Sequence, residues 1–176
     1  MTKARALGAW AFTLVLLAIS AAQAWGLYSI SADAGGGSLS VSGFAAFPVI
    51  GTLLALQVVT VLVSLLVGPL VIRLLAGALI PFMAWNVVDV FLNATSQIQL
   101  TVTQVLADQT GVIQDISSNQ FLVESSSNLF SWGYLVASGL NILVLSLLVA
   151  VTLKPKVAKT VRKIDKLPED LWSDQR

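Results

Sequence analysis

The sequence predicts an all-α membrane protein with four transmembrane helices, and three observations support this prediction. Of its 176 residues, 56% are hydrophobic and 11% charged, whereas soluble domains carry about 25% charged residues. Its first and last apolar runs match the length of about 20 residues that spans a bilayer, and the second run is long enough for two spans. All ten Lys and Arg residues lie before the first run, inside the second, or after the last. We therefore expect one membrane domain, residues 1–153, and a basic tail, residues 154–176.

The first apolar run predicts a helix over residues 7–27, preceded by Lys3 and Arg5. A basic start before an apolar run is also typical of a signal peptide, and residues 21–24 (AAQA) resemble a cleavage site. The run is longer than the apolar part of most signal peptides. It ends at Trp25 and Tyr28, which are typical anchors at a membrane interface. We favour a helix that is retained in the protein.

The next segment, residues 28–46, is a polar loop whose start has two interpretations. Two alternating pieces, 27–31 and 38–42, flank Gly35, Gly36 and Gly37. Period-two alternation around a glycine turn indicates a β-hairpin. A plain flexible loop is the alternative, and the sequence does not separate the two.

A long apolar run from Phe44 to Phe91 predicts a helical hairpin with helices at 47–67 and 70–92. The Gly68–Pro69 pair is a turn signal, and Pro48 suits a first helical turn. Pro81 is expected to bend the second helix, because a proline removes one backbone hydrogen bond. Arg73 lies just beyond the turn, and we interpret it as a residue that sets the orientation of the hairpin in the membrane.

Residues 93–128 form a second polar loop, with three acidic residues and no basic one. Alternation over residues 98–103 favours a strand, whereas the spacing of Ile98, Val102, Val105 and Leu106 fits one helical face. Structureless loops of this length are uncommon, so we expect regular structure here. The two polar loops are predicted to pack together as a small cap outside the cytoplasm.

The last apolar run predicts a fourth helix over residues 129–153. Trp132 and Tyr134 near its start are expected interface anchors, and Gly133 and Gly139 are expected to mark close helix contacts. Six basic residues follow, and all but Lys154 share one face of a predicted amphipathic segment that can lie on anionic lipid headgroups. They are Lys154, Lys156, Lys159, Arg162, Lys163 and Lys166. Under the positive-inside rule, this distribution of charge places both termini in the cytoplasm.

The composition excludes several kinds of chemistry. The chain has no cysteine and no histidine, which excludes disulfides, thiol catalysis and Ser-His-Asp triads. No catalytic residue, metal site or cofactor is predicted, and the protein is not expected to be an enzyme. Nucleic acid is not an expected partner, because no basic and aromatic pattern of a known binding fold is present.

Polar residues within the apolar runs are the candidate functional positions. Asn86, Asp89 and Asn93 are spaced to share one helix face, which could bind a cation, relay a proton or hold a partner subunit. Alternatively, Asp89 lies in the outer interface, because it is about 28 Å along its helix. A further set, Gln57, Thr60 and Asn141, is expected to make hydrogen bonds between helices, with a path for a solute as the alternative.

Several segments together resemble the actinobacterial tryptophan-operon-associated four-helix transmembrane protein family. They are the early helix ending near Trp25, the stretch SLSVSGFAAFP (38–48), the connection VGPLVIRLLAG (67–77), TGVIQD (110–115), the run 129–151 and the basic tail. The resemblance covers nearly the whole chain. It implies a multi-pass protein of the bacterial plasma membrane, without known catalytic residues.

The function expected from these features is that of a non-catalytic accessory subunit, with the lipid bilayer and other integral membrane subunits as partners. For an actinobacterial protein, a respiratory supercomplex of cytochrome bc and oxidase units would be a host. The alternative is a small membrane protein that binds or transports a small solute or an aromatic amino acid. The sequence shows no internal repeat of broken helices, which is the usual signature of a transporter.

Overall fold

The computed structural model describes residues 3–30, 36–110, 122–127 and 130–151 as a helical bundle with a small β-sheet at one end. Four helices are long and apolar enough to cross a membrane: α1 (Lys3–Ala22), α3 (Pro48–Leu66), α4 (Pro69–Thr110) and α5 (Phe130–Ala150). The predicted four long apolar helices are confirmed. The first helix is shifted toward the N-terminus relative to residues 7–27, because the backbone becomes a strand at Ala24.

The four helices pack around a common apolar interior. Helix α5 lies between α1 and α4, while α3 packs against α1 and, less extensively, against α4. Large apolar side chains also cover the outside of the bundle, including Leu66 (90% exposed) and Leu74 (66% exposed). A soluble monomer rarely exposes so much apolar surface. This surface therefore suits lipid.

Proline and glycine set the boundaries of the central hairpin, as predicted. Helix α3 begins at Pro48, and α4 begins at Pro69, directly after Gly68. A short helix, α2 (Gly43–Ala46), precedes α3, and the Ser42 hydroxyl caps it by accepting a hydrogen bond from the Ala45 amide. Helix α4 continues through Pro81.

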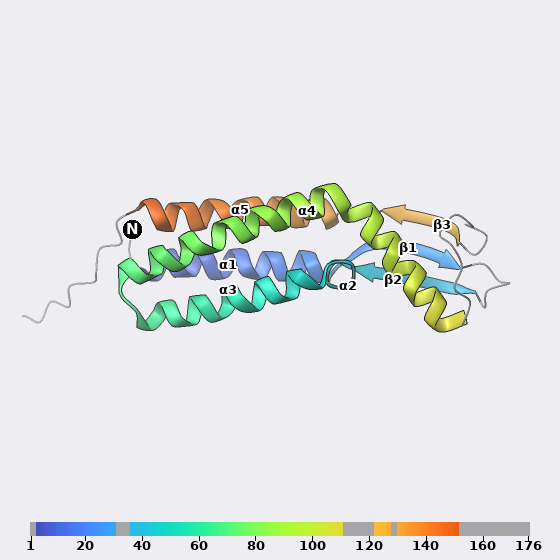
Figure 1. Cartoon of the computed structure of the whole chain (residues 1–176), viewed down its shortest axis with the longest axis horizontal. Coiled ribbons are helices and arrows are strands. Elements are labelled where there is room, and N and C mark those ends of the chain that lie inside the picture. The colour runs from blue at the N-terminus through green and yellow to red at the C-terminus, as the bar shows by residue number, and fades with distance from the viewer. Residues whose placement is uncertain (1–2, 31–35, 111–121, 128–129, 152–176) are drawn as a thin grey trace, which may run out of the picture.

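Helix α4 is almost twice the length predicted from hydropathy. Its 42 residues correspond to about 63 Å, whereas the bilayer core needs only about 30 Å. The prediction of a helix ending at residue 92 is therefore wrong, and much of the loop predicted at 93–128 is helical. In Figure 1, α4 changes direction as it leaves the bundle, and its last part lies across the strands.

The strands form a three-stranded antiparallel sheet in the order β2-β1-β3. The predicted hairpin is confirmed as β1 (Ala24–Ile30) and β2 (Gly37–Ser42), with Tyr28 opposite Leu39. Gly36 and Gly37 have φ angles of 65° and 127°, a region that favours glycine. The third strand, β3 (Leu122–Ser127), was not predicted.

The second half of α4 and the sheet enclose a small apolar core, and we call this unit the cap. Val41, Ile98 and Val102 are buried in it, which confirms the helical interpretation of this segment. At Gly26 an added Cβ would lie 2.8 Å from Tyr28 Cε2 and 3.0 Å from Ile98 Cγ2. Glycine thus allows the helix and the sheet to approach closely.

Candidate functional site

The middle of the bundle contains a set of hydrogen-bonded polar side chains, which we call the central network: Trp10, Thr13, Gln57, Met83 and Asn141. Trp10 Nε1 donates to Gln57 Oε1 at 3.1 Å. Gln57 Nε2 in turn donates to Met83 Sδ at 2.9 Å. Because these residues lie on α1, α3 and α4, the bonds connect three of the four membrane helices.

The fourth helix joins the central network through Asn141 on α5. Asn141 Nδ2 donates to Thr13 Oγ1 at 2.9 Å, and the Thr13 hydroxyl donates to the Trp10 carbonyl at 2.8 Å. Thr13, Gln57 and Asn141 lie near the middle of their helices. The network therefore crosses the bundle at about half its depth.

The predicted polar positions Gln57, Thr60 and Asn141 are all buried. Gln57 and Asn141 bond to other helices, as expected, whereas the Thr60 hydroxyl donates to the Leu56 carbonyl of its own helix. Sequence reasoning missed Trp10 and Met83. An indole N–H in the middle of an apolar run is a signal that could have pointed to Trp10, because buried tryptophans usually pair that group.

At the junction between bundle and cap, Trp25 packs between Tyr134 and Phe47, with ring centroids 5.4 and 6.0 Å away. Its indole N–H donates to the Ser20 carbonyl at 2.9 Å. The Tyr134 hydroxyl donates to Asn86 Oδ1 at 2.6 Å. Trp25 is 0% and Tyr134 is 1% exposed. The prediction that they are interface anchors is wrong, because both rings fill the core below the cap.

The other two predicted anchors also differ from each other. Trp132 is 59% exposed and lies edge-on to Phe91, with ring centroids 6.3 Å apart, as suits a membrane interface. Tyr28 belongs to strand β1 and packs on the apolar core of the cap. Burial raises the pKa of the Tyr28 phenol.

The three residues of the predicted polar face, Asn86, Asp89 and Asn93, do not lie on the same side of α4. Asn86 is 2% exposed and points into the bundle toward Tyr134. Asn93 Nδ2 donates to Asp89 Oδ1 at 2.7 Å, in an exposed pair on the outside of α4. The prediction of one shared face is wrong, because Asn86 turns to its partner on α5.

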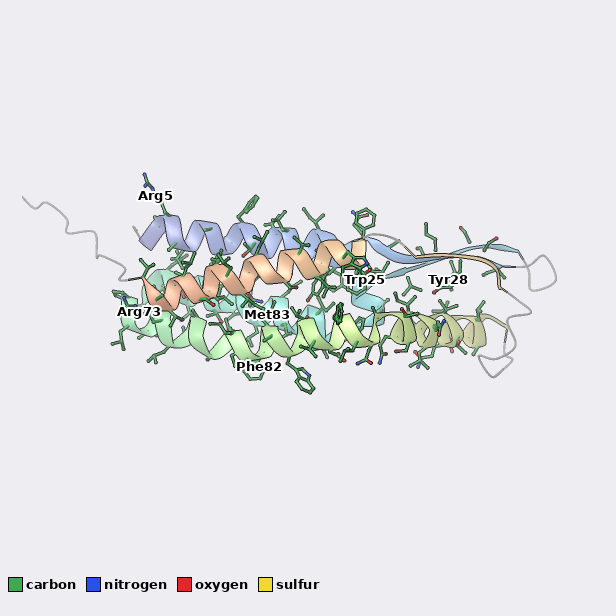
Figure 2. All side chains as sticks on the ribbon, turned by 90° about the horizontal axis from the view of Figure 1, so that it is seen from above. Arg5, Trp25, Tyr28, Arg73, Phe82 and Met83 are labelled. Atoms are coloured by element: carbon green, nitrogen blue, oxygen red, sulfur yellow. The ribbon has the colours of Figure 1, made fainter. Side chains whose placement is uncertain are left out.

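The exposed pair continues a row of large side chains along α4, which we call the outer stripe: Phe82, Trp85, Asp89 and Asn93. Their spacing of three and four residues places them on one side of the helix. Phe82 is 59% and Trp85 75% exposed, and Figure 2 shows Phe82 pointing away from the bundle. A carboxylate is thus held beside exposed aromatic rings.

At the opposite end of the bundle, Arg73 connects two helices. Its Nη2 donates to the Val151 carbonyl at 3.0 Å, just after the end of α5. A cation is favourable there because the last carbonyls of a helix are unpaired and carry partial negative charge. Arg5 and Arg73 lie at this same end (Figure 2). The predicted lipid-binding residues 154–166 lie outside the described residues.

No group of three or more Asp, Glu, His or Cys side chains gathers within the part of the chain that the structure describes. The predicted glycine contacts are also not found, because an added Cβ at Gly133 or Gly139 would meet nothing within 4 Å in the described chain. Comparison with protein-family models, curated proteins and solved structures found no match. The resemblance to the tryptophan-operon-associated family therefore stays a hypothesis.

Proposed function

We propose that this protein is a non-catalytic accessory subunit of a larger bacterial membrane complex, and that the outer stripe binds another integral membrane subunit. The observation that carries the proposal is the Asp89–Asn93 pair, in which Asp89 is half-buried and Asn93 exposed, one turn from the exposed Trp85 on the outside of a membrane helix. Polar side chains on a membrane helix are costly when they face lipid, and large aromatic side chains often dominate binding surfaces. A partner helix that offers a hydrogen-bond donor would suit both features.

Charge supports the same proposal. Between Arg5 and Lys154 the sequence has five acidic residues, Asp33, Asp89, Asp108, Asp115 and Glu124, and one basic residue, Arg73. Arg73 lies at the end of the bundle away from the cap. The partner is therefore expected to present Lys or Arg near the outer stripe and the cap, because complementary potentials guide association.

The orientation belongs to this proposal. The start of α1, the connection between α3 and α4, and the end of α5 lie at one end of the bundle (Figure 1). Every Lys and Arg of the sequence belongs to this end or to the segments that adjoin it. Under the positive-inside rule, both termini lie in the cytoplasm and the cap on the other side.

The resemblance to the actinobacterial family suggests which complex this subunit belongs to. In this proposal it is a respiratory supercomplex of cytochrome bc and oxidase units. Small subunits without cofactor ligands are typical components of such assemblies. The family resemblance supports this choice of host.

Transport of a small solute is the weaker alternative. It would use Gln57, Thr60 and Asn141 as a path. Gln57 and Asn141 instead make hydrogen bonds to Trp10, Met83 and Thr13. A solute would have to replace these bonds, which favours a role for the network in holding the helices together.

Co-purification from native membranes tests the accessory function. The tagged full-length protein, extracted from its own host in a mild detergent, is expected to migrate on native gels within a larger complex. The variants Asp89→Asn and Trp85→Ala are expected to weaken this association, and high salt is expected to weaken it further.

Leu62→Ala is the matched control, since Leu62 is 57% exposed on α3, away from the outer stripe. It should leave the complex intact. If the wild-type protein migrates alone, the accessory function is wrong. If the complex survives both stripe variants, the partner binds elsewhere on the protein.

A further inference from the structure

The hydrogen bonds of the central network fix how the Asn141 amide is oriented. The Thr13 hydroxyl uses its single proton to donate to the Trp10 carbonyl. Thr13 Oγ1 can therefore only accept a bond from Asn141, which must present its Nδ2 group. This leaves Asn141 Oδ1 directed away from Thr13, without a hydrogen-bond donor among the described residues.

A second unpartnered polar atom lies one turn away on the same helix. Ser138 is 0% exposed, and its hydroxyl makes no hydrogen bond of good geometry within the described part of the chain. Its polar neighbour is the Tyr134 hydroxyl, whose proton is donated to Asn86. The Ser138 oxygen can therefore still accept a hydrogen bond. Residues three apart on a helix are neighbours, with Cβ atoms about 5–6 Å from each other. One small molecule can bridge a pair of polar atoms at that separation.

The surroundings limit which molecule this is. On the same buried face of α5, Ala137 and Leu145 offer no polar side-chain atoms, and the Tyr134 hydroxyl already donates to Asn86. The described central network carries no formal charge. An ion is disfavoured because a charge in such apolar surroundings needs a counter-charge. Buried waters typically join polar groups that otherwise lack partners. Asn141 Oδ1 needs a donor, and a water molecule supplies two.

We propose that the bundle binds water between Asn141 and Ser138, as an internal hydration site near the middle of the membrane. Water donates to Asn141 Oδ1 and exchanges a hydrogen bond with the Ser138 hydroxyl. The site extends the central network and does not depend on the accessory function.

Solid-state NMR of the full-length protein in lipid bilayers tests the proposal. Magnetisation is transferred from water to the protein. The rate at which the transferred signal grows at Asn141 and Ser138 is compared with the rate at Leu145, which is also 0% exposed. The transfer is expected to be several-fold faster at Asn141 and Ser138. Equal, slow build-up at all three residues would overturn the proposal.

Variants locate the water. Ser138→Ala should reduce the transfer at Asn141, whereas Ser146→Ala should not. Ser146 is the matched control because its hydroxyl is exposed on α5 and donates to the Ile142 carbonyl. An unchanged signal at Asn141 in Ser138→Ala would contradict the bridge. An organic molecule that co-purifies and contacts Asn141 would replace water as the ligand and also overturn the proposal.

Discussion

Trp10 and Gln57 show what a polar side chain requires inside a membrane bundle. Neither the lipid nor the apolar side chains of the core offer a hydrogen-bond partner, so a polar side chain needs one from its own helix backbone or from another helix. Gln57 meets this need on both sides, since its oxygen accepts from Trp10 and its nitrogen donates to Met83. Single residues of this kind hold several helices in register.

Replacement of Gln57 by leucine is expected to destabilise the protein by about 1–3 kcal/mol, because the buried Trp10 N–H loses its acceptor. Thermal unfolding in detergent measures the effect. Trp10→Phe combined with Gln57→Leu should cost less than the sum of the two single changes, with a coupling of about 0.6–1.7 kcal/mol. Fully additive losses would show that this bond contributes nothing.

Gly43 lies against the Trp25 ring. A Cβ at Gly43 would lie 2.5 Å from Trp25 Cε2 and Cζ2 and 3.0 Å from the Ala21 carbonyl. Gly43→Ala should therefore destabilise the fold by about 1–3 kcal/mol. Gly139→Ala is the control and should stabilise α5 by about 0.5–1 kcal/mol, because its site is open and lies within a helix. Equal melting temperatures for the two variants would refute the tight contact.

The burial of Tyr28 predicts how the stability of the cap depends on pH. Its pKa is raised above the ordinary 10.0 because burial disfavours the phenolate. The cap therefore loses stability as the pH rises above 10, where the unfolded chain ionises first. The chain has two tyrosines, so absorbance titration of Tyr134→Phe reports on Tyr28 alone. Denaturant should lower the midpoint of this titration, and an unchanged midpoint would contradict the burial of the ring.

At the scale of elements, α4 is the feature that organises the molecule. Its first half belongs to the bundle and its second half covers the sheet of the cap. The other membrane helices also lead directly into the cap: α1 into β1, β2 through α2 into α3, and β3 into α5. The cap is thus held by all four membrane segments, although its own core is small.

Ile98→Ala tests whether the cap can loosen by itself. Ile98 is 7% exposed between α4 and the sheet, and the change should cost about 2–5 kcal/mol. Hydrogen exchange is expected to increase in β1 and β2 but not in α3. Leu100→Ala is the control, since Leu100 is 46% exposed on the same helix. Faster exchange throughout the bundle would mean that cap and bundle unfold together.

At the scale of the whole molecule, polar groups and charges are separated along the long axis. Among the charges between Arg5 and Lys154, the one basic residue, Arg73, lies at the end of the bundle away from the cap (Figure 2). The five acidic residues lie in α4 from Asp89 onward or in the segments that connect the membrane helices on the cap side. The membrane potential and the positive-inside rule act on this asymmetry. It determines the orientation that we propose.

Cysteine labelling tests the orientation, and the native chain contains no cysteine that would interfere. Ser40→Cys, at an exposed position of β2, should react with a membrane-impermeant maleimide in intact cells. Ala4→Cys, exposed at the start of α1, should react only after permeabilisation. The reverse pattern would show that the termini lie outside.

The sequence by itself determined the four membrane helices, the Gly68–Pro69 turn and the start of α3 at Pro48, and it offered the hairpin of the cap as one of two interpretations. These features depend on local properties: the length of apolar runs, the backbone limits of proline and glycine, and the alternation of side chains. Each property acts within a few residues of the chain, so it can be recognised in the sequence without knowing which distant segments pack together.

Only the tertiary structure decided which polar and aromatic residues meet. Trp25 and Trp132 both follow the pattern of an interface anchor, yet one fills the core and the other is exposed. In a membrane protein, the lipid-facing and inward-facing sides of a helix are both apolar, so hydropathy does not separate them. The continuation of α4 beyond residue 92 and the addition of β3 depend in the same way on contacts between distant segments. The central network and the outer stripe therefore emerge only when the four helices are packed together.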